Sequence, residues 1–132
     1  MSTIRRQITI EASPRAVWQA LTTPNGLATW LVDEARVDAR QGGRIVLKMD
    51  DLEETGMLLT FRPISKFEIT WDKVSPGPWK GTVTEFTLTR DGKEALLNLH
   101  HSGPAFDDEA VQKEADTFWR RAFTALRDGL EG

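Results

Sequence analysis

The chain contains no cysteine and no tyrosine, and only two of its 132 residues are histidines. Without cysteine, neither a disulfide framework nor a thiolate metal site can form. This composition suits a reducing compartment, so we expect a cytoplasmic protein. The N-terminal stretch MSTIRRQITIEASP lacks the apolar core of a secretion signal, in agreement with that expectation.

Basic clusters and long apolar runs are also missing. Acidic residues outnumber basic ones 20 to 17, and basic residues never occur in runs longer than two. A nucleic-acid-binding surface of clustered Lys and Arg is therefore not indicated. The longest uncharged stretch, 16–32, is interrupted by polar residues and a Pro-Asn-Gly break, so it is no membrane span. We expect one soluble domain over residues 1–132, a size that can bury its own core.

Short alternating runs between two helical zones predict the secondary structure. Ser13 as a cap before Pro14 predicts a helix that breaks at 23–26, and a second short helix is expected over 27–31. The acidic run DDLEE at 50–54 is expected to form a solvated hairpin tip. Alternation of apolar and polar residues predicts strands at 3–11, 33–40, 44–49, 57–62, 66–72, 81–90 and 95–102.

Apolar residues at helical spacing predict one long helix over 107–128, with Gly129 as a left-handed stop. At ~1.5 Å per residue, this helix is long enough to cross a whole sheet. The strand connections are too short for crossovers, so the sheet should be antiparallel. The pattern therefore predicts an α+β fold in which a sheet face and the stripe of the last helix cover each other.

Four stretches resemble the START-like, helix-grip superfamily, also called SRPBCC. They are IEASPRAVWQALTTPNGLATWL (10–31), GGRIVLKM (42–49), ITWD (69–72) and LHHSGPAF (99–106). Within the superfamily, the chain looks like the bacterial single-domain proteins similar to the C-terminal domain of the Hsp90 ATPase activator. The resemblance implies a curved antiparallel sheet of about six to seven strands wrapped around a long C-terminal helix, with two short helices after the first strand. It also implies a cavity for an apolar ligand between sheet and helix.

Adjacent histidines in the last strand must point to opposite faces unless the strand bulges. His101 shares the parity of Leu97 and Leu99, so we place it inward and His100 in solvent. A metal site that uses both is therefore not expected, and no cysteine or third histidine exists to complete one. For His101 two interpretations stay open: contact with a ligand, or a buried histidine bonded to its neighbours.

The five tryptophans divide between core and cavity. Trp18 lies on a helix stripe and is expected in the core, whereas Trp79 lies in a breaker-rich loop and could be a lid or exposed. Trp119 also lies on a helix stripe and is expected in the core, and its inward position includes it among the residues that would line the cavity. Residues on the inward parity of the strands and on the helix stripes form the predicted ligand-binding set: Trp30, Leu47, Met49, Trp71, Phe86, Leu99, His101, Phe118 and Trp119.

No arrangement of residues calls for catalysis. Paired carboxylates at a useful separation, a Ser-His-Asp order and a phosphate loop are all absent from the pattern, so we predict no catalytic residue, metal or cofactor. Arg6 shares the inward parity at the sheet edge and could hold a carboxylate or reach the rim. Arg44 follows the Gly-Gly turn and should be exposed.

Three functions remain open at this stage. The first is non-catalytic binding of a small apolar or amphipathic molecule in the cavity. The second, which rests on the resemblance alone, is regulation of a chaperone during stress. The third is a cavity enzyme that uses His101. No partner surface for nucleic acid or membrane is indicated, and the sequence leaves open whether two copies form a homodimer.

Overall fold

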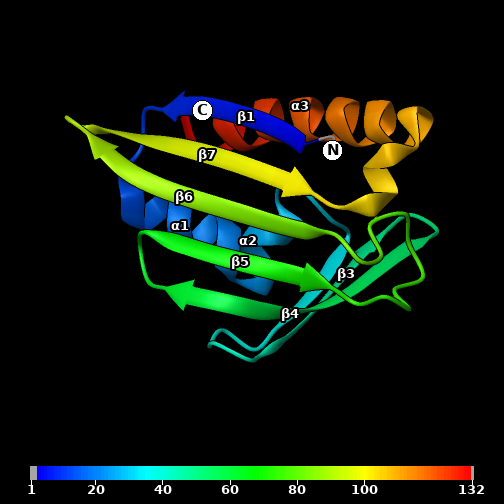
Figure 1. Cartoon of the computed structure of the whole chain (residues 1–132). Coiled ribbons are helices and arrows are strands. Elements are labelled where there is room, and N and C mark those ends of the chain that lie inside the picture. The colour runs from blue at the N-terminus through cyan, green and yellow to red at the C-terminus, as the bar shows by residue number, and fades with distance from the viewer. Residues whose placement is uncertain (1–2, 132) are drawn as a thin grey trace.

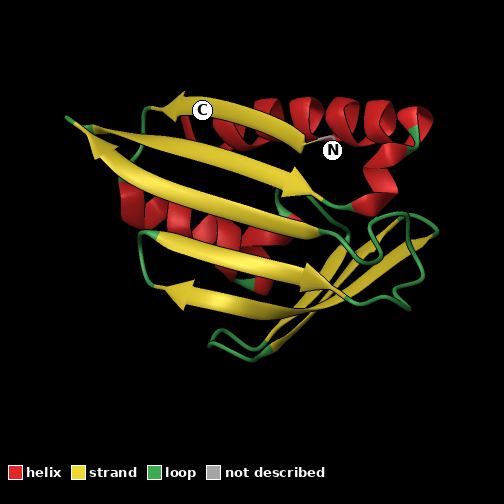
Figure 2. Cartoon of the chain, viewed as in Figure 1, coloured by secondary structure: helices red, strands yellow, loops and turns green. Residues whose placement is uncertain are grey.

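The computed structural model describes residues 3–131 and shows one antiparallel sheet with all helices on one of its faces (Figures 1 and 2). The predicted α+β helix-grip architecture is therefore confirmed. In chain order the elements are β1 (Thr3–Ile10), α1 (Pro14–Thr22), α2 (Pro24–Ala28), β2 (Glu34–Val37), β3 (Arg44–Met49), β4 (Leu52–Arg62), β5 (Lys66–Trp71), β6 (Val83–Asp91), β7 (Glu94–Ser102), the 3₁₀ helix η1 (Pro104–Asp107) and α3 (Glu109–Glu131).

The sheet has seven strands in the order β1-β7-β6-β5-β4-β3-β2, and every neighbouring pair is antiparallel. Strands β2 to β7 form a meander, while β1 crosses over to pair with the last strand. A register shift between Leu58 and Thr60 lets β4 bend, as β-bulges do. The sheet therefore curves around the helices, and β1 lies beside α3 (Figure 1).

Local signals mark the starts of α1, at the predicted Pro14, and of α3, two residues after the predicted start. The Ser13 hydroxyl accepts a hydrogen bond from the Ala16 amide at 3.1 Å, and Pro14 follows as the first helical residue of α1. At the start of α3, the Asp108 carboxylate accepts from the amides of Ala110 and Val111. The carboxylate there also faces the positive end of the helix dipole.

The core lies between the concave face of the sheet and the helices. Inward residues of β5, β6 and β7 alternate with half-exposed ones, as strand geometry requires. The buried positions Ala115, Trp119, Ala122, Phe123 and Leu126 form the stripe that α3 presents to them. Sheet face and helix stripe thus cover each other, which is the relationship that the hydrophobic pattern predicted.

Several predicted boundaries are wrong. Helix α2 spans Pro24–Ala28, whereas the sequence predicted a break at 23–26 and a helix over 27–31. Strand β4 begins at Leu52, so only Asp50 and Asp51 form the turn, and Glu54 is part of the strand. Helix α3 continues to Glu131 through Gly129, which has no positive φ, so the predicted left-handed stop is not there. Strand β2 covers only four residues of the predicted 33–40.

Two connections meet at the end of the sheet where α3 begins. They are the turn between β3 and β4 and the loop 72–82 between β5 and β6 (Figure 1). Strand β5 ends at Trp71, which leaves the β4 residue Thr55 without a strand neighbour on that side. The loop takes its place, because the Asp72 amide donates to the Thr55 carbonyl at 2.9 Å. This loop therefore acts as a continuation of the sheet, and it carries several residues of the site described next.

Candidate functional site

His101 lies on the inner face of β7 with no exposed surface, whereas its neighbour His100 is exposed. The opposite orientation that strand alternation predicted for the two rings is confirmed. The indole N–H of Trp119 donates to Nδ1 of His101 at 3.0 Å, so Nδ1 is an acceptor and a neutral ring carries its proton on Nε2. Nε2 then donates to the Thr82 hydroxyl at 2.8 Å, and that hydroxyl donates to the Trp79 carbonyl at 2.6 Å.

Both ring nitrogens of His101 are therefore occupied by protein groups. Burial lowers the pKa of His101 to about 3, so the ring stays neutral at physiological pH. The close approach of β7 to Thr82 depends on Gly103, where an added Cβ would lie 2.8 Å from the Thr82 Cα. These contacts favour the interpretation of His101 as a buried structural histidine.

For Trp79, the predicted environment differs from the observed one. A breaker-rich loop suggested a lid or an exposed side chain, yet only 3% of Trp79 is exposed. Its ring stacks on Trp119 at a centroid distance of 5.3 Å and packs edge-on against His101 and Phe118. The loop is therefore folded into the core, with Trp79 at the centre of an aromatic cluster.

Glu54 is a second buried polar group. Unlike His101, it was predicted to be solvated, in a hairpin tip. Its side chain points inward from β4 with no exposed surface, close to the loop 72–82. The Ser75 hydroxyl donates to one carboxylate oxygen at 2.6 Å, and the Trp79 amide donates to the other at 2.9 Å. Burial raises the pKa of Glu54, and these two hydrogen bonds offset part of that rise.

A glycine makes room for this carboxyl group. A Cβ at Gly77 would lie 2.1 Å from a carboxylate oxygen of Glu54, so no larger residue fits there without a shift. The parity of the strand could have indicated the inward orientation, because Glu54 lies four positions before the inward Leu58 and side chains in a strand alternate with a period of two. The acidic run around it concealed that signal.

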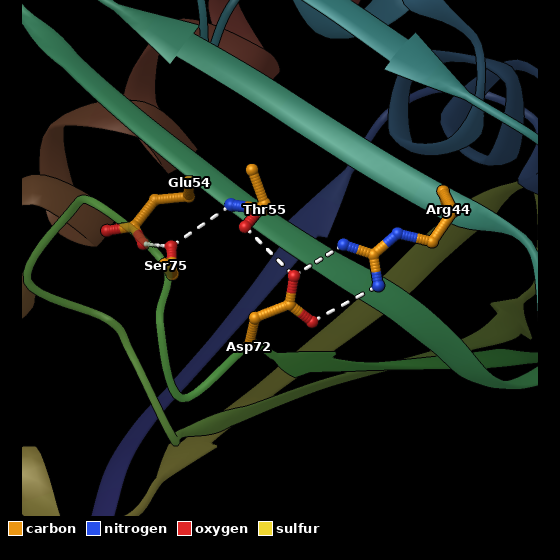
Figure 3. Close-up of polar contacts among 5 residues, drawn as sticks. All are labelled: Arg44, Glu54, Thr55, Asp72 and Ser75. Carbon is orange, nitrogen blue, oxygen red and sulfur yellow. Dashed lines mark hydrogen bonds and ion pairs between the residues drawn. The ribbon is translucent and has the colours of Figure 1, made fainter.

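The adjacent residue Thr55 faces the other side of β4 and belongs to a separate polar network (Figure 3). Its hydroxyl donates to the Asp72 carboxylate at 3.0 Å, and Arg44 from β3 donates to both oxygens of the same carboxylate. The Arg44 guanidinium lowers the pKa of Asp72. Ser75 connects the two networks, since its oxygen accepts from the Thr55 amide while its hydroxyl serves Glu54.

The space between sheet and helix is almost filled. The central space among Trp30, Trp71, Phe86, Trp119 and their neighbours measures about 10 Å³, close to the least that holds one water molecule. Side-chain contacts explain this, because the Trp71 indole donates to Thr84 at 2.8 Å and Phe86 packs edge-on against Trp119. A ligand could enter the central space only if these side chains moved.

Larger hollows lie along α3. We call the first the end hollow; it measures about 260 Å³, and its lining comes from the turn between β3 and β4, the loop 72–82 and the first half of α3. Three acidic residues line it, Asp50, Glu54 and Glu114. The rest of its lining is apolar: Met49, Leu52, Pro78, Trp79, Val111, Ala115 and Phe118.

The second, which we call the flank groove, is more open and measures about 600 Å³. It lies between the segment Trp30–Leu31 and α3, and it shares Glu114 and Phe118 with the end hollow. Its charged lining is mixed, because Lys113 and Arg121 accompany Glu114. Phe118 therefore separates two hollows of different charge.

The predicted ligand-binding residues are distributed over these spaces. Phe118 lines both outer hollows, Met49 lines the end hollow, and Trp30 lines the flank groove and the central space. Leu99 and His101 are fully buried and line none of the three spaces. The remaining four line only the central space: Leu47, Trp71, Phe86 and Trp119.

The basic residues considered from the sequence lie at the surface. Arg6 pairs with Asp116 of α3 at 2.8 Å, with its side chain partly buried, so it ties β1 to the last helix. Arg44 is exposed, as predicted, and is held by Asp72. Over residues 3–131, no three His, Cys, Asp or Glu side chains are grouped in a way that would hold a metal ion. In the same range, no helix has the length and apolar character to span a membrane.

Comparison with known proteins decides the family. The model for the family described as "Activator of Hsp90 ATPase homolog 1-like protein" matches residues 11–131. The chain belongs to this family. A search of curated proteins finds no match. The similarity that LHHSGPAF and the other three stretches indicated is therefore confirmed at the level of the family.

Solved structures of other proteins share the fold over nearly the whole chain. The Aha1 dimer from Colwellia psychrerythraea is 26% identical with a TM-score of 0.84, covering 99% of this chain and 97% of that one. CalU16 from Micromonospora echinospora is 25% identical with a TM-score of 0.77, covering 96% and 80%. Protein MLL2253 from Mesorhizobium loti, at 24% identity, a TM-score of 0.86 and coverage of 98% and 97%, supports the fold alone.

Proposed function

We propose that this protein binds a small apolar or amphipathic molecule beside α3, with the end hollow as the primary site. The observation that carries the proposal is the hollow itself, about 260 Å³ in volume, with mostly apolar walls and a few polar groups. Binding sites for small molecules generally combine these two features. The helix-grip fold of the family supports the same function.

The site begins at Met49 and Phe118, the two predicted residues that the end hollow already exposes to a ligand. The other residues of the predicted set would join the contact only if a ligand pushed Phe118 or Trp30 aside and entered the central space. His101 is the least accessible of them, because Trp119 and Thr82 occupy its ring nitrogens. We therefore propose binding rather than catalysis.

A filling variant tests this proposal. Val111 is half-buried on α3 at the edge of the end hollow, so V111W should occupy the space and leave the core intact. The control is T124W, at an exposed position of the same helix outside both hollows. A thermal-shift and native-mass-spectrometry screen of small apolar molecules should find ligands that bind wild type and T124W but not V111W. Ligands that bind all three proteins equally would contradict this site.

Two further properties come from the comparisons and are proposed on that ground alone. The family description refers to an activator of the Hsp90 ATPase, so the alternative function is regulation of such a chaperone. Stimulation of the host chaperone's ATPase by the purified protein would favour it. The Colwellia protein is described as a dimer, and we propose a homodimer here as well. Sedimentation equilibrium that gives the monomer mass at all concentrations would exclude the dimer.

A further inference from the structure

The charged groups that line the end hollow all have the same sign. They are Asp50 from the turn before β4, Glu54 from β4 itself and Glu114 from α3. These three side chains come from different elements, so the fold brings their charges together around one apolar space. The flank groove, in contrast, carries Lys113 and Arg121 as well, so the uniform charge is specific to the end hollow.

Glu54 has hydrogen-bond donors but no cation. Its two donors are the hydroxyl of Ser75 and the amide of Trp79, both uncharged. Among residues 3–131, the ion pairs involve other carboxylates, and none includes Glu54. Buried charges in proteins are usually paired with an opposite charge, because burial without one is costly. Glu54 therefore adds to the lining of the end hollow a negative charge that no cation among residues 3–131 pairs with.

The apolar walls add a second preference for the same kind of ligand. Trp79 and Phe118 both line the hollow and pack edge-to-face with a centroid distance of 5.3 Å. Aromatic rings attract cations through the negative potential of their faces, most strongly where water is excluded. They also accept the apolar part of a ligand. Anions receive no corresponding attraction from the side chains of this hollow.

We infer that the end hollow takes a small amphipathic amine, with its ammonium group toward the three carboxylates and its apolar body against Phe118 and Trp79. This inference rests on the proposed function, because it specifies the ligand of the same site. Asp50 and Glu114 are exposed and can pair with the ammonium group directly. Glu54 has no exposed surface and acts through its charge from beneath the wall. At 260 Å³ the hollow fits an arylalkyl amine rather than a long-chain lipid.

Three probes with one skeleton separate charge from apolar binding: 2-phenylethylamine, 2-phenylethanol and 3-phenylpropanoate. Each is titrated into the ¹⁵N-labelled full chain at low salt and neutral pH, and amide shifts around Trp79 and Phe118 are followed. We expect the amine to bind roughly tenfold or more tightly than the alcohol, the size of a partly desolvated charge interaction. The carboxylate should bind more weakly than the alcohol, and salt should reduce the preference for the amine.

Charge-neutral variants assign the preference to residues. E54Q and E114Q should each reduce the ratio of amine to alcohol affinity severalfold, because each removes a negative charge that attracts only the amine. The control is D128N, which removes a charge from the exposed far end of α3. E54Q keeps the shape of the side chain, and its amide oxygen can accept from the Trp79 amide while its NH2 group donates to the Ser75 oxygen in a reversed hydrogen bond. The alcohol titration reports whether the hollow stays intact in each variant.

The outcomes distinguish the two proposals. Alcohol or carboxylate binding as tight as amine binding, with the same shifts, would overturn the inference and leave ligand binding in place. Amine binding that neither E54Q nor E114Q alters would also overturn the inference. If none of the three probes shifts the signals of the hollow while the screen finds no other ligand there, the proposed function fails together with it.

Discussion

The Trp119 indole N–H donates to Nδ1 of His101 at 3.0 Å, and this contact joins the last helix to the last strand through two fully buried side chains. The histidine in turn donates to Thr82, so the bond is one link in a chain that ends at the Trp79 carbonyl. Polar chains of this kind stabilise a fold when complete and are costly when one member is missing. The grip of the sheet on α3 therefore depends on a polar contact as well as on apolar packing.

Replacement of Trp119 by phenylalanine should be strongly destabilising. W119F leaves the buried Nδ1 of His101 without a donor and removes part of the stacking on Trp79. We expect a loss of about 2–4 kcal/mol in the free energy of unfolding, measured by urea denaturation. The control is W18F, because Trp18 packs against Phe61 and Phe67 and has no hydrogen bond from its indole among residues 3–131. Equal losses in the two variants would contradict the role of the hydrogen bond.

Acid should destabilise the protein partly through His101. The pKa of His101 is lowered to about 3 in the folded chain from 6.5, so below pH 6.5 the unfolded chain binds the additional proton. The contribution of this residue is complete above pH 6.5 and declines by roughly 1.4 kcal/mol per pH unit as the pH falls toward 3. Unfolding free energies of wild type and H101Q, measured between pH 7.5 and 4.5, should converge toward low pH. Parallel curves would show that His101 does not carry this dependence.

Glu54 should contribute with the opposite sign. Burial raises its pKa above 4.5, so the protonated side chain is favoured by folding and its contribution is lost as the pH rises through the folded pKa. E54Q imitates the protonated form. We therefore expect the stability of E54Q relative to wild type to increase from pH 4.5 to pH 7.5 in the absence of ligand. A difference in stability that is constant with pH would mean that folding does not raise the pKa of Glu54.

Gly77 should tolerate no side chain. G77A places a Cβ 2.1 Å from a Glu54 carboxylate oxygen, so the loop or the carboxyl group must move. We expect a loss of about 1–3 kcal/mol and altered amide signals at Ser75 and Trp79. The control is G129A, since Gly129 lies in α3 with nothing within 4 Å of an added Cβ. There alanine should stabilise the helix by up to about 1 kcal/mol. A neutral G77A would show that Glu54 and the loop are not tightly packed.

Periodicity in the sequence was sufficient to predict the layers of the fold. Alternation along the last strand separated His101 from His100, and the spacing of apolar residues located α3. These patterns can be read from the sequence because strand pairing sets the inward face for all residues of a strand together. They do not depend on contact with a single partner. Ser13 and Pro14 likewise act within one turn of helix, so their effect is local and readable.

The residues of the end hollow were harder to predict because their environment is made by distant segments. Trp79 follows two prolines, which indicate a loop but not the path of that loop over the core. Glu54 is buried only because the loop 72–82 folds over it and supplies two donors. At Gly129 a local signal was misleading instead. Glycine often ends a helix, but α3 continues through it to Glu131.

The central claim is that the end hollow binds a small apolar molecule. The most direct measurement is an NMR titration of the ¹⁵N-labelled protein with 2-phenylethylamine, reading the amides of Leu52, Trp79 and Phe118 against Thr124 as a remote reference. The account predicts saturable shifts at the first three positions that disappear in V111W. Shifts that do not saturate, or that persist unchanged in V111W, would contradict it.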